Sequence, residues 1–389
     1  MKRFACRCLG LQSFLQQPGD GRRQGQIPAA DLMWAQLAAE VLRYGSFHSV
    51  ERLVRSAARR RLGVSRRFGD DALAYFSERL DLEVLRSAAI GVVRRVKRNK
   101  AFDASRFIGL ALDGTGAARS ERGGCALCHP RTDAEGQPVG HVHHFSLISI
   151  VGTGLVLPFD VEAQHPGEGE LPTSTRLLQR AVSRLGRRYA SYVVGDGAYA
   201  VAPFLHAANA CGLHVVARLK GNLPTLHTAA QARFATMPPT LSFREDRDVV
   251  EVWDADDFDP WDSLAWPSVR VLRYRQHKPG GAVVEAFWLT DFSTSHVGAR
   301  ALYRMAKSRW QIENGAFNDG KNRYGLERIR HHTPTSVVAT WLVVCLAIMI
   351  ERLYRLRYLH RGTHQPRTAI ELHFLFWLAL GRPSPPDSS

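Results

Sequence analysis

Two aspartates in this sequence each follow a short apolar run and stand next to glycine. Asp113 ends the run RFIGLALD, and Asp196 lies between Gly195 and Gly197 after SYVV. Both runs have the length and β-branched composition of buried strands. Ligands bind at the carboxyl ends of strands in open α/β sheets, and glycine allows another group to approach closely. Asp-Gly is also a common turn dipeptide, so either aspartate alone could be a turn residue, but two in one predicted sheet favour a site.

A third acid, Glu313, lies in the segment RWQIENGAF. Arg309 and Glu313 are four residues apart, so they share one face of a helix, an arrangement that on an exposed helix is only a surface contact. Trp310 and Ile312 mark neighbouring apolar faces, and we therefore expect this helix to pack on the sheet and bring Glu313 to the aspartates. Carboxylate oxygens suit Mg²⁺ or Mn²⁺. Two such ions roughly 4 Å apart can catalyse phosphoryl transfer.

The elements around these residues follow a mixed α/β pattern. After the Asp113 strand, HVHHFSLISIVGTGLVLPFDVEA predicts two strands joined at 152–154, followed by a helix over 174–185, the strand SYVVGDGAY, a helix over 203–210 and the strand LHVVARLK. This order predicts a mixed sheet with helices on its faces. DVVEVWDA, VRVLRYRQ and AVVEAFWLTDF predict further strands. A helix over 299–318 follows, and then a hydrophobic helix over 337–353, whose apolar run is too short to cross a bilayer.

The net charge is strongly positive. The chain has 52 Lys and Arg against 36 Asp and Glu, a net of +16, and its first hundred residues have 20 against 9, a net of +11. Such an excess attracts polyanions and supports phosphate contacts. Short helices with basic ends, such as Arg59 to Arg61 and the RRVKRNK that ends at Lys100, predict a DNA-binding region. Solvated helix faces are the alternative.

Composition narrows the class of protein further. The chain is 45 % apolar, which argues against wholesale disorder. Its six cysteines are too sparse for a disulfide framework. The N-terminal residues lack the apolar core and cleavage site of a secretory signal. We therefore expect no membrane association and a cytoplasmic, nucleoid-associated location.

A second metal site is suggested by CALCHPRTDAEGQPVGHVHHF. Cys125 and Cys128 have the two-residue spacing of a zinc knuckle, and thiolate and imidazole ligands suit tetrahedral zinc. In a strand His141 and His143 share one face, while His144 lies on the other. The candidate structural zinc site is therefore Cys125, Cys128, His141 and His143. Reduced thiols in a loop beside solvated histidines are the alternative.

Together, LDGTG, VVGDGAY, LTDF, RWQIENGAFNDGKNRYGL and the following HH-P resemble the insertion-sequence transposases of the DDE type that carry a Tyr-Arg-Glu-Lys signature. The resemblance covers about residues 106–347 and includes a β-rich insertion before the glutamate. It implies a ribonuclease-H-like core with Asp113, Asp196 and Glu313 as catalytic metal ligands. It also implies that Arg309 contacts a DNA phosphate. Trp310 would stack on a base, as aromatic side chains do with unpaired nucleotides, or pack in the core.

Two signature positions differ from the family pattern. The family has Tyr three residues before the Arg and Lys seven residues after the Glu, where this chain has Ala306 and Gly320. Tyr303 and Lys321 are the nearby candidates for DNA contacts, but on a regular helix each points about 80° away from the face of Glu313. An irregular helix, different phosphate contacts or decayed activity would each explain the difference. The fallback acids are Asp319 and Glu327. The adjacent pair His331-His332 lies near DNA or, more usually, caps a helix end.

The predicted fold is α/β: a ribonuclease-H-like mixed sheet with flanking helices, a β-rich insertion and an N-terminal helical domain. The expected parts are a basic helical DNA-binding region over 1–100, core over 101–220, insertion over 221–292, the rest of the core with C-terminal helices over 293–380, and a disordered tail over 381–389. The resemblance implies a transposase that cleaves double-stranded DNA at the element ends and joins it to target DNA with two Mg²⁺ or Mn²⁺ ions. We expect a homodimer on DNA, because two ends must be held together. The alternatives are a decayed or repurposed DNA-binding protein and a non-mobile nuclease.

Overall fold

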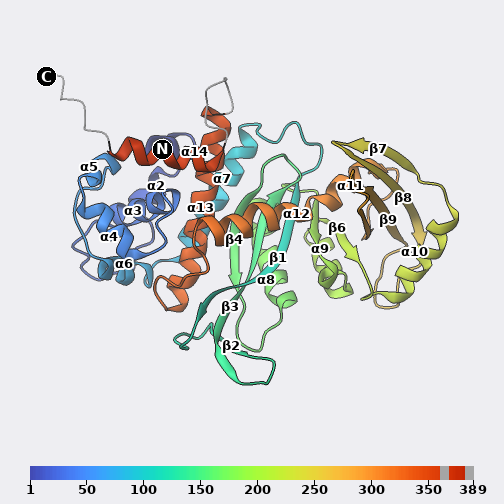
Figure 1. Ribbon diagram of the computed structural model, residues 1–389, viewed down its shortest axis with the longest axis horizontal. Helices are drawn as coiled ribbons and strands as arrows, with labels where there is room; N and C mark the ends of the chain where they lie inside the picture. Colours follow the sequence, from blue (N-terminus) through green and yellow to red (C-terminus); the bar gives the residue numbers. More distant parts are fainter. Residues whose placement is uncertain (360–367, 382–389) are drawn as a thin grey trace.

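The computed structural model describes residues 1–359 and 368–381. A helical region, a central sheet and a β-rich region follow one another along the long axis of the molecule (Figure 1). Of the tail expected over 381–389, only Gly381 lies within the described residues, where it ends helix α14. The prediction of disorder therefore falls outside the described part of the chain.

A single ten-stranded sheet runs through the core and the insertion. Its order is β2-β3-β1-β5-β6-β10-β9-β8-β7, with β4 paired to β3. Strand β1 is antiparallel to β3 and parallel to β5, and β5 is parallel to β6. The strands are β1 Gly109–Ser120, β2 His129–Thr132, β3 Pro138–Val151, β4 Leu157–Ala163, β5 Tyr192–Gly195, β6 His214–Leu219, β7 Leu241–Glu245, β8 Asp248–Phe258, β9 Val269–His277 and β10 Val283–Thr290.

Strands β4, β3, β1, β5 and β6 form the predicted ribonuclease-H-like mixed sheet. Along the chain, β1, β3 and β4 are followed by α8, β5, α9 and β6, which is the predicted order, with the short β2 as an addition. The turn between β3 and β4 contains Gly152 and Gly154, each with φ of 75°, a conformation that glycine adopts without strain. The predicted fold class is confirmed.

The insertion extends the core sheet, because β10 pairs antiparallel with β6. The three strands predicted in this part of the chain correspond to β8, β9 and β10. Helix α10 and strand β7 were not predicted. In α10, Leu226, Ala230 and Phe234 are buried at intervals of four residues, which gives the helix one apolar face.

Most helices lie in the N-terminal region or against the faces of the sheet. In Figure 1, α12 passes in front of the strands and α8 lies behind them. The helices are α1 Lys2–Arg7, α2 Gln12–Gln16, α3 Ala29–Val41, α4 Phe47–Arg55, α5 Ala58–Leu62, α6 Asp70–Ser77, α7 Leu82–Arg98, α8 Glu170–Leu185, α9 Ala202–Ala210, α10 Pro224–Thr236, α11 Ala299–Lys307, α12 Arg309–Ile312, α13 Pro334–Tyr358 and α14 Ala369–Gly381.

Helix α13 is the central apolar helix. It contacts α3, α7 and β4, so it joins the N-terminal helices to the sheet. Among the described residues it is the one helix whose length and composition would allow it to cross a membrane, yet 94 % of its most apolar window is buried within the protein. It thus includes the buried helix expected over 337–353.

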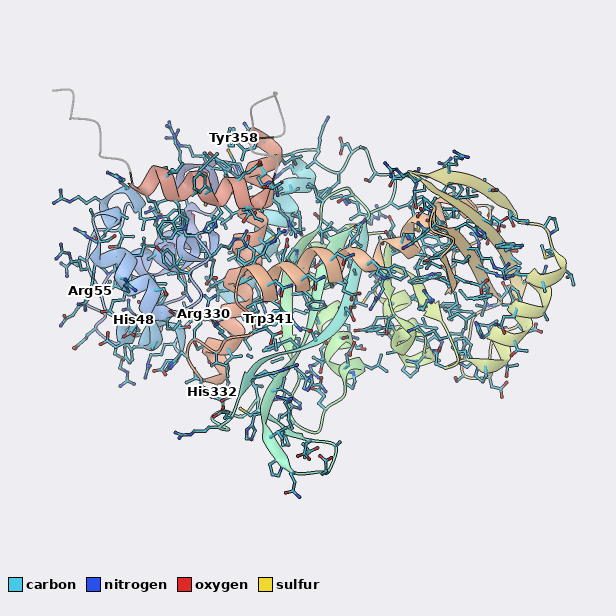
Figure 2. All side chains as sticks on the ribbon, in the orientation of Figure 1. His48, Arg55, Arg330, His332, Trp341 and Tyr358 are labelled. Atoms are coloured by element: carbon cyan, nitrogen blue, oxygen red, sulfur yellow. The ribbon has the colours of Figure 1, made fainter. Side chains whose placement is uncertain are left out.

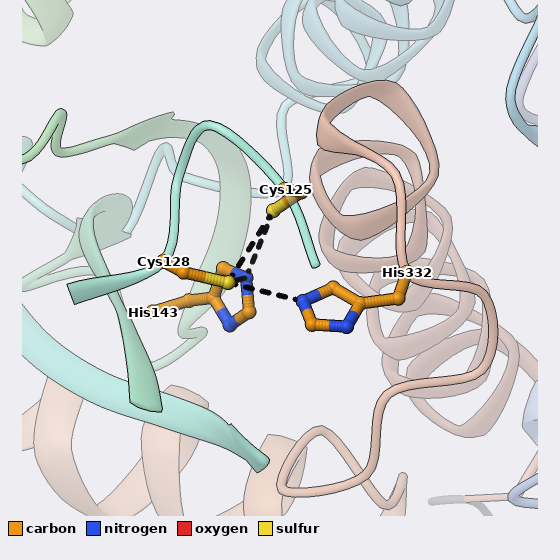
Figure 3. Close-up of side chains that lie close together, drawn as sticks. All are labelled: Cys125, Cys128, His143 and His332. Carbon is orange, nitrogen blue, oxygen red and sulfur yellow. Dashed lines mark hydrogen bonds between the residues drawn. The ribbon is translucent and has the colours of Figure 1, made fainter. Parts of the chain in front are cut away.

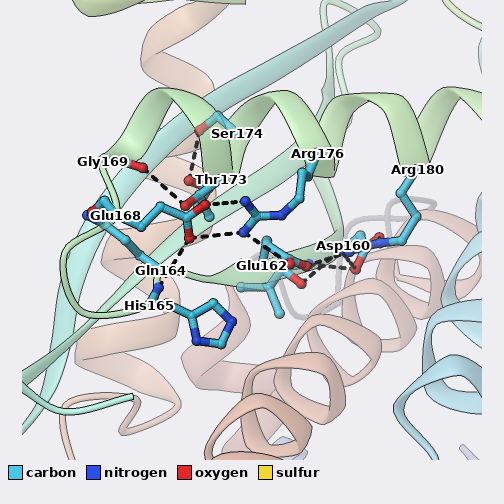
Figure 4. Close-up of polar contacts among 12 residues, drawn as sticks. Asp160, Glu162, Gln164, His165, Glu168, Gly169, Thr173, Ser174, Arg176 and Arg180 are labelled. Atoms are coloured by element: carbon cyan, nitrogen blue, oxygen red, sulfur yellow. Dashed lines mark hydrogen bonds and ion pairs between the residues drawn. The ribbon is translucent and has the colours of Figure 1, made fainter. Parts of the chain in front are cut away.

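Charged side chains hold helix α8 against β4 and against the loop that follows β4 (Figure 4). Arg180 donates from Nε to Oδ2 of the fully buried Asp160 at 2.9 Å, and Arg176 donates to Glu168 in the preceding loop at 3.0 Å. The helix begins at Glu170, one turn earlier than predicted. This extra turn contains Pro172, and proline is tolerated in the first turn of a helix.

Candidate active site

Asp113 and Asp196 come from adjacent parallel strands. The last residue pair between β1 and β5 is Ala111 with Val194, and each aspartate lies two residues further along the chain. Because β1 continues to Ser120 beside β3, Asp113 lies within its strand and not at its end, contrary to the sequence prediction. Only the pairing with β5 ends there. Asp196 directly follows β5, and its Oδ1 accepts a hydrogen bond from the Ala198 amide at 2.8 Å.

A single guanidinium connects the first aspartate to the glutamate. Arg309 lies 3.2 Å from Asp113 through Nη2 and 3.2 Å from Glu313 through Nη1. The side chains of Arg309 and Asp113 are only 17 % and 15 % exposed, whereas that of Glu313 is 50 % exposed. The expected helix therefore does pack on the sheet, and it carries Glu313 to the guanidinium that also holds Asp113.

Hydrogen bonds dock the start of α12 on the core. The buried Ser308 lies 3.0 Å from the hydroxyl of Tyr192 in β5, and Gln311 accepts from the Gly152 amide at 3.0 Å. The helix expected over 299–318 is irregular: α11 and α12 meet at Ser308, and two π-helical segments, Glu313–Phe317 and Asp319–Arg323, follow. Widened turns of this kind are frequent at functional sites.

The widened turns change the direction of Lys321. Its ammonium group donates to the carbonyl of Gly116 at 2.9 Å and lies 3.5 Å from Glu327. Gly116 is three residues beyond Asp113 on β1. The sequence argument that Lys321 points away from Glu313 holds only for a regular α-helix, so this residue remains a candidate for a DNA contact.

The aromatic candidates have different environments. Tyr303 is fully buried and donates to Glu245 at 2.6 Å, which leaves no surface for DNA, and we exclude it from the DNA contacts. Trp310 is half-buried, with its ring edge-to-face against Trp288 at 5.8 Å. It therefore packs against β10, which is the second of the two roles that the sequence allowed.

Glu170 is an additional acid that the sequence reasoning missed. A Cβ atom at Gly114 would lie 2.3 Å from the carboxyl carbon of Glu170, so the glycine leaves the space that this carboxylate fills beside Asp113. Tyr199 donates to Glu170 at 2.6 Å and lies 3.0 Å from Ser174. The signal in the sequence is an acid in the first turn of a helix that follows a core strand, but the helix predicted from apolar spacing begins only after this turn.

The carboxylates influence one another. The pKa of Asp113 is raised to about 6, first by burial and then by the charges of Glu170 and Asp196, while the charge of Arg309 opposes the shift. Burial and mutual repulsion destabilise the ionised carboxylates, and a cation bound between them would offset this repulsion. The crowded carboxylates are therefore a chemically suitable donor set for divalent ions.

The fallback acids are engaged elsewhere. Asp319 pairs with Arg352 at 2.8 Å and with Arg323 at 3.1 Å, and the exposed Glu327 lies beside Lys321. Among the candidates from this helix, Glu313 is the acid that shares a guanidinium with Asp113.

The cysteine pair lies in a compact group with two histidines (Figure 3). The candidate ligand atoms of Cys125, Cys128, His143 and His332 all lie within 4.8 Å of one another. His141 was expected in this group, but His332 takes its place. Strand β3 directs His143 inward, and the segment before α13 supplies His332 as the second imidazole. Burial raises the pKa of the Cys125 thiol to about 11 and lowers the pKa of both imidazoles in the group.

Neither residue of the pair His331-His332 caps a helix. The cap of α13 is Thr333, whose side chain accepts from the Ser336 amide. His331 lies 3.0 Å from Glu78 in the N-terminal region.

Comparison with known proteins identifies the family. Residues 109–350, more than half of the chain, match the family described as "Transposase DDE domain", and the chain belongs to this family. The comparison with curated proteins gives no match. Among solved structures, the chain is similar to the cryo-EM structure of a piggyBac transposase synaptic complex with hairpin DNA, at 10 % identity and a TM-score of 0.47, covering 92 % of this chain and 74 % of that one. The prediction of a DDE-type transposase is thus confirmed, and transposases are a class of enzyme that cleaves and joins DNA.

Proposed function

We propose that this transposase cuts DNA at the ends of an insertion sequence and joins the freed ends to target DNA, with Asp113, Asp196 and Glu313 as the ligands of two divalent ions. The observation that carries the proposal is the shared guanidinium of Arg309, which brings Glu313 to Asp113 beside the strand that precedes Asp196. When bound, Mg²⁺ or Mn²⁺ would activate the attacking oxygen and stabilise the leaving oxygen.

The chain's own residues bind and orient the DNA. With Asp113 and Glu313 holding divalent ions, the guanidinium of Arg309 would be free to bind a DNA phosphate, for which its fork of donors is suited. Lys321 offers an ammonium group above β1 to a neighbouring phosphate. The packing of Trp310 against Trp288 supports a structural role for this ring over stacking on an unpaired base.

The N-terminal region would hold the flanking duplex. Its exposed arginines include Arg52, Arg55 and Arg60, and Figure 2 places Arg55 at the outer side of the helical region. Phosphate contacts from such a surface are independent of sequence and weaken steeply with salt. Because two element ends must be held together, we propose a homodimer on double-stranded DNA, and we place the protein at the nucleoid in the cytoplasm.

The proposal is tested with a duplex that carries the inverted repeat flanking the reading frame. Asp113→Asn and Asp196→Asn should each lower end cleavage by at least about 10³-fold, because transition-state charge loses its stabilisation. DNA affinity should change little. The matched control is Asp262→Asn, the same change at an exposed aspartate of the insertion, which should cleave like the wild type. Cleavage by either asparagine variant at the wild-type rate would refute the assignment.

The same assay separates the alternative functions. Specific binding by the wild type with no cleavage in Mg²⁺ or Mn²⁺ would indicate a decayed or repurposed DNA-binding protein. Cleavage without joining to target DNA would indicate a non-mobile nuclease.

A further inference from the structure

We propose that Cys125, Cys128, His143 and His332 bind a structural zinc ion that fastens the chain following Glu313 to the catalytic sheet. The four side chains come from three separate places: the loop between β1 and β2, strand β3, and the segment that enters α13. Cys128 and His332 are 204 residues apart in sequence. The proposal concerns a site distinct from the three acids and does not depend on their role in cleavage.

The distances within the group fit a tetrahedral ion. Zn–S bonds of about 2.3 Å and Zn–N bonds of about 2.0 Å separate two sulfurs by about 3.8 Å and a sulfur from a nitrogen by about 3.5 Å. The Sγ atoms of Cys125 and Cys128 are 3.8 Å apart. His143 Nε2 lies 3.2 Å and 3.6 Å from the two sulfurs, and His332 Nε2 lies 3.2 Å from Cys128 Sγ.

The surroundings orient the donors. His143 is fully buried, and its Nδ1 is 2.9 Å from the carbonyl of Ala118. Since a carbonyl only accepts, Nδ1 carries the proton and the lone pair of Nε2 faces the sulfurs, which is the arrangement that zinc-binding histidines show. The loop also approaches His332 closely: a Cβ at Gly124 would lie 2.6 Å from its Nδ1. Hydrogen-bonded thiols alone would not require four donors to converge in this way.

The site is adjacent to the elements that hold the acids. Gly116, which accepts from Lys321, pairs across the sheet with His144, the neighbour of His143. His332 follows the π-helical segments and immediately precedes the cap of α13, and Figure 2 places it between the lower end of the sheet and the start of that helix. A bound ion would thus fix both the strands beneath Lys321 and the chain that leads away from it. Binding would release the two thiol protons to solvent.

The first test is the metal content of full-length protein purified without chelators and without DNA. The wild type should hold about one zinc per chain, and His332→Gln should fall below about 0.2, because removal of one of four ligands greatly weakens a structural site. The matched controls His331→Gln and His141→Gln should retain the wild-type content. Asp113→Asn should also retain it, so failure of the active-site proposal would leave this result unaffected.

A second test remains informative if His332→Gln fails to fold. His332→Cys keeps a ligand of suitable chemistry, and after cobalt replacement it should give the absorption of a tetrahedral site with an additional thiolate. In the wild type, chelation should speed proteolytic cleavage within 324–333 at least about tenfold, because the segment loses its anchor. The proposal is overturned by wild-type protein with less than about 0.2 zinc per chain, or by loss of zinc in His141→Gln with retention in His332→Gln.

Discussion

The ionised carboxyl of Asp113 is in an unfavourable electrostatic environment, which a bound metal ion would neutralise. Its carboxyl is mostly buried, faces two other acids and has one arginine as its counter-charge. Its pKa of about 6 is above the ordinary value of 3.8. The folded protein therefore binds this proton more tightly than the unfolded chain does, and the contribution of Asp113 to stability falls as pH rises from about 4 to about 6.

Replacement of Asp113 by asparagine should therefore stabilise the metal-free protein. In EDTA at pH 8, Asp113→Asn should raise the free energy of unfolding by up to roughly 3 kcal/mol, and near pH 4 the gain should disappear. Urea denaturation at both pH values measures the difference, with Glu327→Gln as an exposed control. Added Mg²⁺ should stabilise the wild type and not the variant. An Asp113→Asn protein that is less stable than the wild type at pH 8 would contradict this view of the site.

Glu170 gives a second prediction at the scale of single residues. Glu170→Gln removes a charge beside Asp113, and Gly114→Ala should displace the carboxylate because its new methyl group would occupy the same space. Each change should weaken Mg²⁺ binding about tenfold, the lower end of the effect seen when a group that supports a metal site is removed. Titration of Mg²⁺ by calorimetry measures this.

A matched glycine tests whether the effect of Gly114→Ala is local. At Gly169 a Cβ would meet only Pro172, at 3.8 Å, so Gly169→Ala should leave the Mg²⁺ affinity unchanged. Wild-type affinity in both Glu170→Gln and Gly114→Ala would show that Glu170 is only a favourable acid in the first turn of α8.

At the scale of elements, α12 and the π-helical segment that follows it bring Arg309 and Glu313 together beside Asp113 of β1. Because Arg309 lowers the pKa of Asp113, Arg309→Gln should raise it further. Proton and metal compete for the carboxylate, so the acid limb of the cleavage profile at limiting Mg²⁺ should move to higher pH by about one unit, within the usual range for one opposite charge. Each profile is normalised to its plateau, which separates this shift from weaker phosphate binding. An unshifted acid limb would mean that Arg309 does not act on Asp113.

Most regular elements of the core were predictable, whereas its irregular turns were not. Nearly continuous apolar runs predict the strand that contains Asp113 and the strand that precedes Asp196, because strands buried on both faces are apolar along most of their length. The π-helical turns that bring Lys321 to Gly116 have no periodic signal, and they depend on packing against the sheet. His332 was missed as a member of the cysteine–histidine group for a similar reason: a side chain 204 residues from Cys128 is brought beside it by tertiary structure alone.

At the scale of the whole molecule, a buried ion pair joins the N-terminal helices to the chain that precedes α13. Arg330, in the chain between Glu313 and α13, donates to Glu40 of α3 at 2.8 Å and to the carbonyl of Tyr324 at 3.0 Å. The two side chains of the ion pair are 2 % and 1 % exposed, and burial lowers the pKa of Arg330 to about 10. The pair joins the expected DNA-binding region to the segment that carries His332.

Breaking one side of this pair should be costly. Glu40→Leu would leave a buried guanidinium without its partner and should lower the free energy of unfolding by about 3–5 kcal/mol, whereas Glu40→Leu with Arg330→Met should recover most of this stability. Denaturation of the three proteins measures the coupling. A double variant as unstable as the single one would show that Arg330 acts through the Tyr324 carbonyl and not through Glu40.

The positive charge of the N-terminal region gives the last prediction. Glutamine at the exposed Arg52, Arg55 and Arg60 should weaken binding to all duplexes alike, because arginine contacts with phosphate carry no sequence information. The slope of log K against log salt should become shallower by about 0.9 for each phosphate that the variant no longer neutralises. A control with glutamine at Arg244, Arg247 and Lys278, exposed residues of the insertion, removes the same charge from the other end of the molecule. If affinity and slope fall equally in both triple variants, net charge alone drives binding. A change confined to the first variant instead places the duplex along α4 and α5.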